Sequence, residues 1–171
     1  MAFWTDAAAE DPKRKFNFIV EISATPGTRP QSYHVKTASL PKFNVNKVEA
    51  KYFNHTFKYP GSITWDPVSL TFIDSSQDDS ASTSFMKLLE GMGYYVPSSG
   101  LDQSSISKRK AVSSLGTVKL MQLDSDGGTI NTWTLRNAFI TSVTFGDLAY
   151  GEDELVEVQV EIDYDFAEYD S

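Results

Sequence analysis

Alternation of apolar and polar residues is the dominant pattern along the chain, and it predicts a protein built mainly of β-strands. The alternation is strictest from Glu157 to Phe166. Its apolar positions are Val158, Val160, Ile162, Tyr164 and Phe166, and its polar positions are Glu157, Gln159, Glu161, Asp163 and Asp165. Because side chains point alternately to the two faces of a strand, we expect one strand with a buried face and a column of acids on its wet face.

Shorter stretches repeat the alternation and predict further strands. Their apolar positions are Phe16, Phe18, Val20 and Ile22; Tyr33 and Val35; Phe53, Phe57 and Tyr59; Val68, Leu70 and Phe72; and Val118 and Leu120. Turn signals separate these strands at Leu40-Pro41, Pro60-Gly61 and Asp126-Gly127-Gly128, of which the last predicts a hairpin. The segment from Trp133 to Phe145 keeps one parity except at Arg136-Asn137-Ala138, which predicts a bend or bulge.

One segment has a helical period instead. Phe85, Leu88, Leu89 and Met92 recur at i, i+3, i+4 and i+7, which predicts a helix over residues 81–93 with one apolar stripe. The candidate N-caps are Asp78, Asp79, Ser80 and Ser82, and Gly91 and Gly93 are expected to end the helix. The Ser-rich stretch at residues 98–114 is expected to be a flexible surface loop.

A chain of 171 residues with 40% hydrophobic residues is long enough to bury the apolar faces of these elements in one core. It contains no internal repeat and no linker-like segment, so we expect a single domain over residues 1–171. The fold class that follows is mainly β, an antiparallel β-sandwich or open barrel with one flanking α-helix. Residues 1–12 are expected to form an N-terminal arm.

Several classes of protein are excluded by what the sequence lacks. No apolar run approaches the roughly 18 residues of a membrane-spanning helix, so we expect no membrane span. The N-terminus has no apolar segment behind a basic start, so we expect no secretory signal. The absence of cysteine excludes disulfides, zinc–thiolate sites and thiol catalysis, and it fits a cytoplasmic product.

No pattern of catalytic or cofactor-binding chemistry stands out. The two histidines, His34 and His55, lie on expected strands without the spacing of a metal site. Nucleophile-elbow, phosphate-loop, dinucleotide-binding and calcium-loop patterns are absent. We therefore expect a protein that is not an enzyme, with no catalytic residue, no metal and no cofactor.

Charge is concentrated at one end of the chain. The formal net charge is −8, yet the segment from Gly146 to Ser171 holds ten acids and neither Lys nor Arg. Residues 1–145 hold 13 acids against 15 bases, so the rest of the chain is slightly positive. A negative balance argues against a protein that wraps nucleic acid. Like charges aligned on one strand face repel each other, which suggests a functional reason for the acidic column.

Several segments, taken in order, carry a family resemblance. They are Lys15–Ile22, Val35–Pro41, Tyr52–Gly61, Ile63–Phe72, the helix at residues 81–93, Trp133–Ile140, Tyr150–Glu154 and the terminal Val-x-Ile-x-Tyr-x-Phe strand. Together they cover nearly the whole chain and resemble the tail tube proteins of contractile-tailed bacteriophages, which are related to the tube proteins of contractile injection systems. The order of the segments and the total length carry the resemblance, not any single motif.

The resemblance implies a structural virion protein. Hexameric rings would stack into the hollow inner tail tube, which conducts viral DNA into the host cell inside a contractile sheath. The implied partners are further copies of the chain, the tail sheath protein, baseplate and tail-terminator proteins and a tape-measure protein, and DNA would pass through the lumen without specific binding. The implied locations are the virion tail and, during assembly, the host cytoplasm. Ring closure would pair exposed strand edges, which otherwise invite aggregation.

The resemblance also suggests a role for the acidic column. Carboxylates on a lumen wall repel DNA phosphates within the Debye length of about 8 Å, so DNA would slide without sticking. We hypothesise that Glu157, Glu161, Asp163 and Asp165 face the lumen. The competing interpretation turns some of them outward, toward a basic sheath surface.

Two further groups are candidates for assembly contacts. A hairpin over residues 44–60 would project onto the next ring, and its polar groups are Lys47, Glu49, Lys51, His55 and Lys58. The basic run Lys108, Arg109 and Lys110 would pair with Glu152, Asp153 and Glu154 of a neighbouring subunit. The alternatives are a solvated hairpin and a solvated loop, since an exposed ion pair contributes only about 0–1 kcal/mol.

Besides an enzyme of unknown type, which would show a pocket holding a carboxyl group with a raised pKa, two other functions remain open at this point. One is the tube protein of a phage-derived injection or secretion system, or a baseplate tube initiator, which genome neighbourhood would distinguish. The other belongs to a different class, a monomeric β-sandwich that binds a small ligand. It predicts a monomer in solution and an enclosed apolar pocket.

Overall fold

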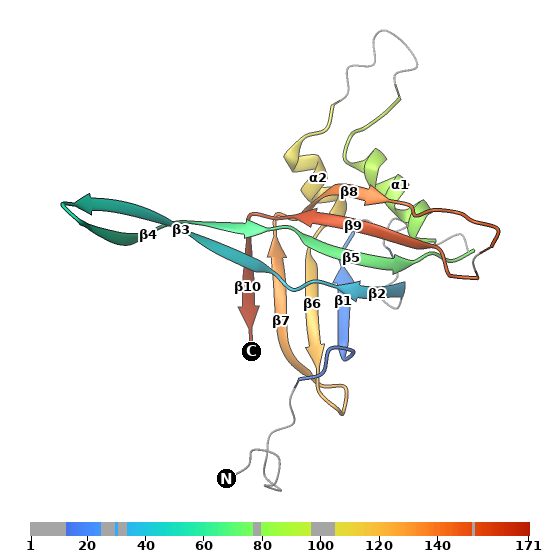
Figure 1. Cartoon of the computed structure of the whole chain (residues 1–171). Helices are drawn as coiled ribbons and strands as arrows, with labels where there is room; N and C mark the ends of the chain where they lie inside the picture. The colour runs from blue at the N-terminus through green and yellow to red at the C-terminus, as the bar shows by residue number, and fades with distance from the viewer. Residues whose placement is uncertain (1–12, 25–29, 31–33, 77–79, 97–104, 152) are drawn as a thin grey trace, which may run out of the picture.

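The computed structural model describes residues 13–24, 30, 34–76, 80–96, 105–151 and 153–171. Several expectations lie outside these ranges: the N-terminal arm at residues 1–12, the loop residues 98–104, Tyr33, Asp78, Asp79 and Glu152. The described part of the chain folds into antiparallel strands and two helices (Figure 1).

Eight of the strands form two four-stranded sheets. The first sheet has the order β1-β6-β7-β10, from Phe18–Ile22, Val118–Leu123, Thr129–Arg136 and Phe166–Asp170. The second sheet has the order β2-β5-β9-β8, from Val35–Ala38, Val68–Ile73, Glu157–Asp163 and Phe139–Thr144. The strands of the two sheets run across each other in Figure 1. This arrangement confirms the mainly β antiparallel class, and each sheet keeps two open edge strands.

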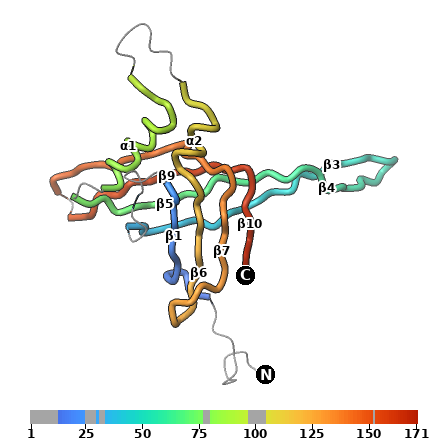
Figure 2. The backbone as a smooth tube through the Cα atoms, turned by 180° about the vertical axis from the view of Figure 1, so that it is seen from behind, coloured from blue at the N-terminus to red at the C-terminus, as the bar shows by residue number. Residues whose placement is uncertain are grey.

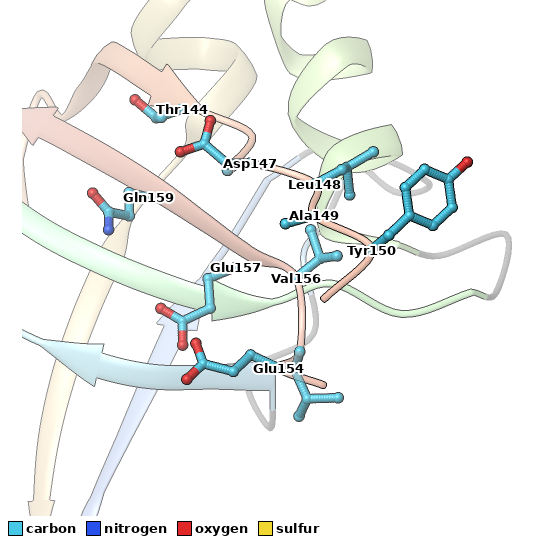
Figure 3. Close-up of a pocket in the computed structure, with 11 residues that line it drawn as sticks. Thr144, Asp147, Leu148, Ala149, Tyr150, Glu154, Val156, Glu157 and Gln159 are labelled. Carbon is cyan, nitrogen blue, oxygen red and sulfur yellow. The ribbon is translucent and has the colours of Figure 1, made fainter. Parts of the chain in front are cut away.

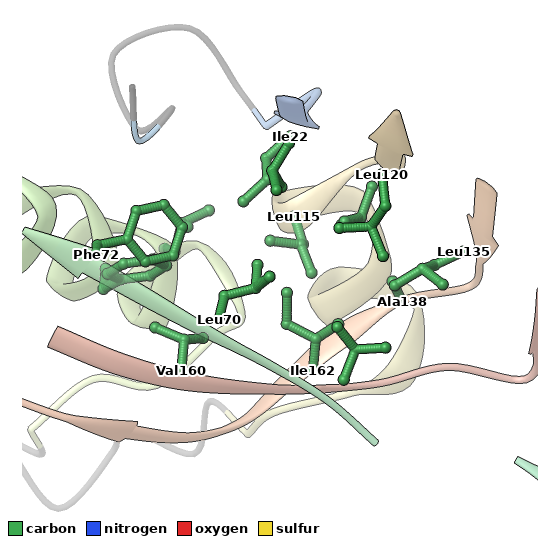
Figure 4. Packing of buried hydrophobic residues seen from close by; sticks show 14 of the residues in the cluster. Ile22, Leu70, Phe72, Leu115, Leu120, Leu135, Ala138, Val160 and Ile162 are labelled. Carbon is green, nitrogen blue, oxygen red and sulfur yellow. The ribbon is translucent and has the colours of Figure 1, made fainter. Parts of the chain in front are cut away.

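The core lies between the inner faces of the two sheets (Figure 4). The alternation predicted from the sequence places the correct residues there, because Val20 and Ile22 of β1 and Val158, Val160 and Ile162 of β9 are all buried. The side chains that fill the centre are Leu70, Phe72, Leu115, Val118, Leu120 and Leu135.

The helix α1 (Ala81–Gly91) lies where the sequence predicts it. Its Ser80 cap accepts a hydrogen bond from the backbone N–H of Thr83 at 3.2 Å. Phe85 and Leu88 are buried, and the ring of Phe85 lies 5.2 Å from that of Phe72 on the inner face of β5. The apolar stripe thus covers the core, as expected for an amphipathic helix.

A second helix, α2 (Lys108–Leu115), corrects the prediction of a flexible loop at residues 108–114, and with it the prediction of a single helix. Ser107 caps α2 by accepting a hydrogen bond from the backbone N–H of Lys110 at 3.3 Å. Ala111, Ser114 and Leu115 are buried at helical spacing, and Ser114 Oγ donates to the Leu88 carbonyl at 3.2 Å. The pattern is hard to detect in the sequence because a serine holds one of its three buried positions.

The prediction of a single strand from Glu157 to Phe166 was wrong beyond Asp163. The chain turns a corner at Tyr164 and Asp165, so β9 belongs to the second sheet and β10 to the first. Phe166 therefore leaves the buried face and is 44% exposed. The alternation of apolar and polar residues continues across the corner, so the sequence pattern gives no sign that the strand ends there.

The predicted bend at Arg136-Asn137-Ala138 is confirmed. It is a second corner, at which the neighbouring strand also passes from one sheet to the other. β7 ends at Arg136 in the first sheet and β8 begins at Phe139 in the second. Asn137 adopts a left-handed conformation with φ 54°, which Asn tolerates better than most residues. Because β7 pairs with β10 and β8 pairs with β9, two neighbouring strands change sheets side by side.

The hairpin of β3 (Lys42–Tyr52) and β4 (His55–Asp66) is longer than the predicted span of residues 44–60. It extends well beyond the two sheets in both views (Figures 1 and 2). Its turn is at Phe53-Asn54, so the prediction of a turn at Pro60-Gly61 was wrong. A β-bulge lies there instead, since Val45 pairs with Ile63 but Lys47 pairs with Pro60. A bulge tolerates proline because the ladder is interrupted at that point.

Candidate functional site

The candidate sites among the described residues are features of the surface. No group of three or more His, Cys, Asp or Glu among them is placed to hold a metal ion. None of the described helices is long and apolar enough to cross a membrane. Four of these features are described below, namely the outer face of the second sheet, the basic run of α2, the hairpin and the loop that joins β8 to β9.

The outer face of the second sheet is polar. Glu157, Gln159, Glu161 and Asp163 of β9 point away from the core, opposite the buried Val158, Val160 and Ile162. Small hydroxyl residues flank them in register, because Glu161 pairs with Ser69 of β5 and with Ser142 of β8. Phe85 of α1 and Leu115 of α2 belong to the core cluster on the opposite side of the sheet, and near the corner Asp163 also lines a hollow with residues of α2. The acids of β9 and the small hydroxyl residues beside them thus form one polar surface.

One acid of the column is paired within the chain. Lys36 Nζ of the edge strand β2 donates to Glu157 Oε1, and this hydrogen bond, together with the carboxylate charge, raises the pKa of Lys36. Glu154 lies close enough to raise it further. Glu161 and Asp163 form no ion pair with any described residue, so these two carry the unbalanced negative charge of the face.

Asp165 does not share the column with the other three predicted lumen residues. It lies at the corner between β9 and β10, where its Oδ1 is 2.6 Å from Lys108 Nζ and its Oδ2 accepts from Asn137 Nδ2 at 2.7 Å. These two hydrogen bonds lower the pKa of Asp165 below its usual value. A carboxylate held this way has an evident structural role, because it ties α2 to both sheet-changing corners.

The basic run of α2 is on the surface of the helix. Lys108 is occupied by Asp165, whereas Arg109 and Lys110 form no ion pair with the described residues. Asp153 and Glu154 are exposed on the β8–β9 loop. Lys108 is thus committed within the chain, whereas Lys110 Nζ only donates to the Ser105 carbonyl at 3.4 Å.

The hairpin has two chemically distinct faces that exchange places at the bulge. Near the body, one face carries the apolar cross-strand pairs Phe43–Trp65 and Val45–Ile63. Beyond the bulge, that same face carries Lys47, Glu49, Lys51 and Lys58. The extra residue in β4 moves the later residues of that strand to the opposite face. In β3 the apolar residues change face as well, because they stand at odd positions up to Val45 and at even positions from Val48 onward.

The outer half of the hairpin presents aromatic residues on its other face. Val48 pairs with Tyr59, Ala50 with Phe57 and Tyr52 with His55, and the rings of His55 and Phe57 lie 4.6 Å apart. Phe53 at the turn is 89% exposed. All of these residues are exposed, and they form one contiguous apolar surface. A contiguous exposed apolar surface of this kind marks an interaction site. The sequence analysis placed Phe57 and Tyr59 on one face of this hairpin, and the pairing adds Val48, Ala50 and Tyr52 to that face.

A hollow of about 950 Å³ lies at the β8–β9 loop (Figure 3). Its apolar lining includes Leu148, Tyr150 and Leu155, and its acidic lining includes Asp147 and Glu154. The side chain of Tyr150 points outward, and Leu148 and Leu155 are 86% and 70% exposed. Sequence reasoning missed this site because the loop has no periodicity, although three apolar residues among acids were a visible signal.

Two comparisons found known proteins that are similar to this chain. The family model of the T4-like virus tail tube protein gp19 matches residues 14–168, and no curated protein matches the chain. A solved structure of the sheath/tube terminator of PVC, an extracellular contractile injection system, is similar, with a TM-score of 0.68 and 16% identity over 96% of this chain and 100% of that one.

Two more solved structures resemble the chain over nearly its full length. The tube-terminating cap of the anti-feeding prophage has a TM-score of 0.66 and 18% identity, over 100% of this chain and 99% of that one. A chain of the PVC sheath–tube complex has a TM-score of 0.64 and 16% identity, over 95% and 93%. These structural similarities show the fold. The family match covers almost the whole chain. The chain belongs to the family of the T4-like virus tail tube protein gp19.

Proposed function

We propose that this chain is the subunit of the hollow inner tube of a contractile phage tail. In this proposal hexameric rings stack into a tube inside a sheath, and the tube conducts viral DNA into the host cell. The observation that carries the proposal is the family match over residues 14–168. The proposed role is structural, without catalysis or a cofactor.

The open edges of the sheets support assembly into rings. The second sheet ends in β2 on one side and β8 on the other, and the first ends in β1 and β10. An unpaired strand edge is a template for another strand, and a ring of copies uses each edge once. Stacking of rings does not end by symmetry, so the proposal needs partners that set the length and close the ends. We assign these roles to a tape-measure protein, baseplate proteins and a tail terminator.

The outer face of the second sheet is the proposed lumen wall. Glu161 and Asp163 supply its negative charge, Glu157 is partly neutralised by Lys36, and small hydroxyl residues surround them. Such a wall repels phosphate and offers DNA no site for counterion-releasing contacts. Asp165 belongs to this proposal only if the corner also borders the lumen. The competing proposal turns these acids toward the sheath protein.

The hairpin is proposed to contact the next ring. Its length and exposed polar groups, which include Lys47, Glu49, Lys51, His55 and Lys58, suit a projecting contact. Deleting residues 48–58 and bridging the strands with a short turn should leave rings or monomers, because the deleted residues contribute nothing to the core. Long tubes formed by this variant would contradict the inter-ring role.

A smaller contact is proposed for the basic residues of α2. Arg109 and Lys110 would pair with Glu152, Asp153 and Glu154 of a neighbouring subunit. Reversing these two cations to Glu should weaken assembly most at low salt, where screening is least. Unchanged assembly at low salt would discard this contact.

Electron microscopy of the concentrated protein tests the proposed function as a whole. Hollow tubes of uniform width are expected, whereas persistent monomers would favour a ligand-binding sandwich. A tube of an injection system, or a baseplate tube initiator, is the second candidate, because the most similar folds described above come from injection-system particles. Sheath and capsid genes beside this one would favour the phage tail, and effector genes without a capsid would favour the injection system.

A further inference from the structure

The two ends of the second sheet carry opposite chemistry. The β3–β4 hairpin extends from one end, because only Pro67 separates β4 from β5. The β8–β9 loop lies at the other end, and both views show the hairpin tip and this loop on opposite sides of the molecule (Figures 1 and 2). Features at opposite ends of one subunit can meet only in two different copies.

The hairpin end is basic and aromatic. Between Lys47 and Tyr59 the chain holds three lysines and one glutamate. Lys47 and Glu49 lie 3.5 Å apart, which leaves Lys51 and Lys58 without an ion-pair partner among the described residues. The aromatic face with Tyr52, Phe57 and Tyr59 lies on the other side of the same two strands. Because a ribbon is one sheet thick, lysine side chains can reach the rim of any site that receives the aromatic face.

The loop end is acidic and apolar. Its hollow places Leu148, Tyr150 and Leu155 beside Asp147 and Glu154, and the described residues from Gly146 to Glu157 include no base. Glu157 is committed to Lys36, whereas Asp147 forms no ion pair with a described residue. Charge and apolar surface are thus complementary between the two ends.

We propose that the tip of the hairpin docks into the hollow of the β8–β9 loop of a second copy of this chain. Aromatic residues of the tip cover Leu148, Tyr150 and Leu155, and Lys51 and Lys58 lie against Asp147 and Glu154. With Glu154 in this contact, Glu152 and Asp153 are the acids left for Arg109 and Lys110. This contact is head-to-tail, so every copy can give one hairpin and receive one, and it propagates through an assembly. The inference rests on the proposed tube function and names the surface that receives the hairpin.

Charge exchange tests the docking in the full-length protein. Lys51→Glu with Lys58→Glu places like charges at the contact, as does Asp147→Lys with Glu154→Lys. Each pair of substitutions should abolish tubes in negative-stain images and shift the protein to rings or monomers in sedimentation velocity. All four substitutions in one chain should restore tubes, because the attraction is restored with reversed sign. Lys13→Glu with Lys15→Glu makes the same charge change at exposed residues away from both ends and should leave tubes intact.

A cross-link tests the docking without altering charge. The chain has no cysteine, so Asn54→Cys at the hairpin turn and Ala149→Cys in the loop introduce the only thiols. A disulfide needs Cα atoms within about 7 Å, so mild oxidation should give a ladder of linked subunits that a reductant collapses. Asn54→Cys with Ser125→Cys, in the β6–β7 turn, is the matched control and should give no ladder of linked subunits.

Failure of the docking is distinguishable from failure of the tube function. Wild-type protein that forms neither rings nor tubes contradicts the tube function, and the cross-link still decides the docking in that case. Wild-type-like tubes that persist in either charge-reversed variant overturn the docking. The docking is also overturned if the fourfold variant forms no tubes and the variant with Asn54→Cys and Ala149→Cys gives no ladder. A ladder of equal extent in the cysteine control overturns it as well.

Discussion

Lys108 and Asp165 form an ion pair with their Nζ and Oδ1 atoms 2.6 Å apart, although 57 residues separate them in the chain. Asn137 donates to the other oxygen of the same carboxylate. The backbone N–H of Asp165 also donates to the Arg136 carbonyl at 3.0 Å. One side chain therefore connects α2 to the two places where neighbouring strands pass from one sheet to the other.

Replacing Asp165 with Asn should destabilise the fold in a pH-dependent way. Lys108 and Asn137 lower the folded-state pKa of Asp165 below 3.8, so its stabilisation is complete above that value. It is lost as the pH falls through the lowered folded-state pKa. Urea unfolding should show a lower free energy of unfolding for Asp165→Asn at pH 7, and the gap from wild type should close in strong acid. Asp126→Asn in an exposed turn is the control, and an equal effect there would contradict the role of the corner.

Shortening Leu115 should show that α2 is part of the core. Leu115 is fully buried against both sheets, and removing its branched end leaves a cavity. Leu115→Ala should lower the free energy of unfolding by about 2–5 kcal/mol. Ser113→Ala, on the exposed side of the same helix, should change it by less than about 0.5 kcal/mol. Chemical denaturation monitored by tryptophan fluorescence measures both, and similar small effects would mean that α2 does not hold the fold.

Adding a methyl group to Gly116 should destabilise the end of α2. Gly116 has φ 70° and ψ −144°, a conformation that other residues adopt at a cost of about 1–3 kcal/mol. A Cβ there would also lie 2.1 Å from the Ser23 carbonyl oxygen. Gly116→Ala should therefore lower the melting temperature measured by circular dichroism. Gly151→Ala is the matched control, since its Cβ would meet nothing within 4 Å and the melting temperature should not move.

Reversing the charge of the acidic face should create a DNA-binding surface. Glu161→Lys with Asp163→Lys replaces the two unpaired acids of β9 by cations, without touching a buried side chain. Assembled tubes of this variant should bind duplex DNA at low salt and release it as salt rises, because phosphate contacts release counterions. Co-sedimentation with DNA at several salt concentrations measures this. Glu90→Lys on α1 is the control, and equal binding by both variants would contradict a lumen position for β9.

Much of the fold follows from local pattern. The alternation in β1, β5 and β9 identifies the residues that are buried, and the stripe through Phe85 and Leu88 identifies α1. The turn at Asp126 is equally local, since Asp124 Oδ1 accepts from the backbone N–H groups of Asp126 and Gly128 at 2.9 and 2.7 Å. These features depend on neighbours in the chain and on one buried face, which a sequence records directly.

The candidate sites divide in the same way. The polar residues of the hairpin and the acids of β9 were visible as residue types on a strand. Their surroundings were not visible. Lys36 contacts Glu157 from a strand that is 121 positions away in the chain, and the corner after Asp163 places Asp165 beside Lys108 instead of in the acidic column. The shared face of Phe57 and Tyr59 was also visible, but their partners Val48 and Ala50 on β3 were not, since the bulge at Pro60–Gly61 shifts the pairing register.

The sequence by itself determined the class of fold, the inward and outward sides of each strand and the concentration of charge at the C-terminal end. Only the tertiary structure decided which sheet each strand joins, that residues 108–115 are helical, and that the hairpin and the β8–β9 loop lie at opposite ends. The physical reason is that alternation and helical period report one buried face each, whereas sheet-changing corners and long-range ion pairs arise from packing between distant segments.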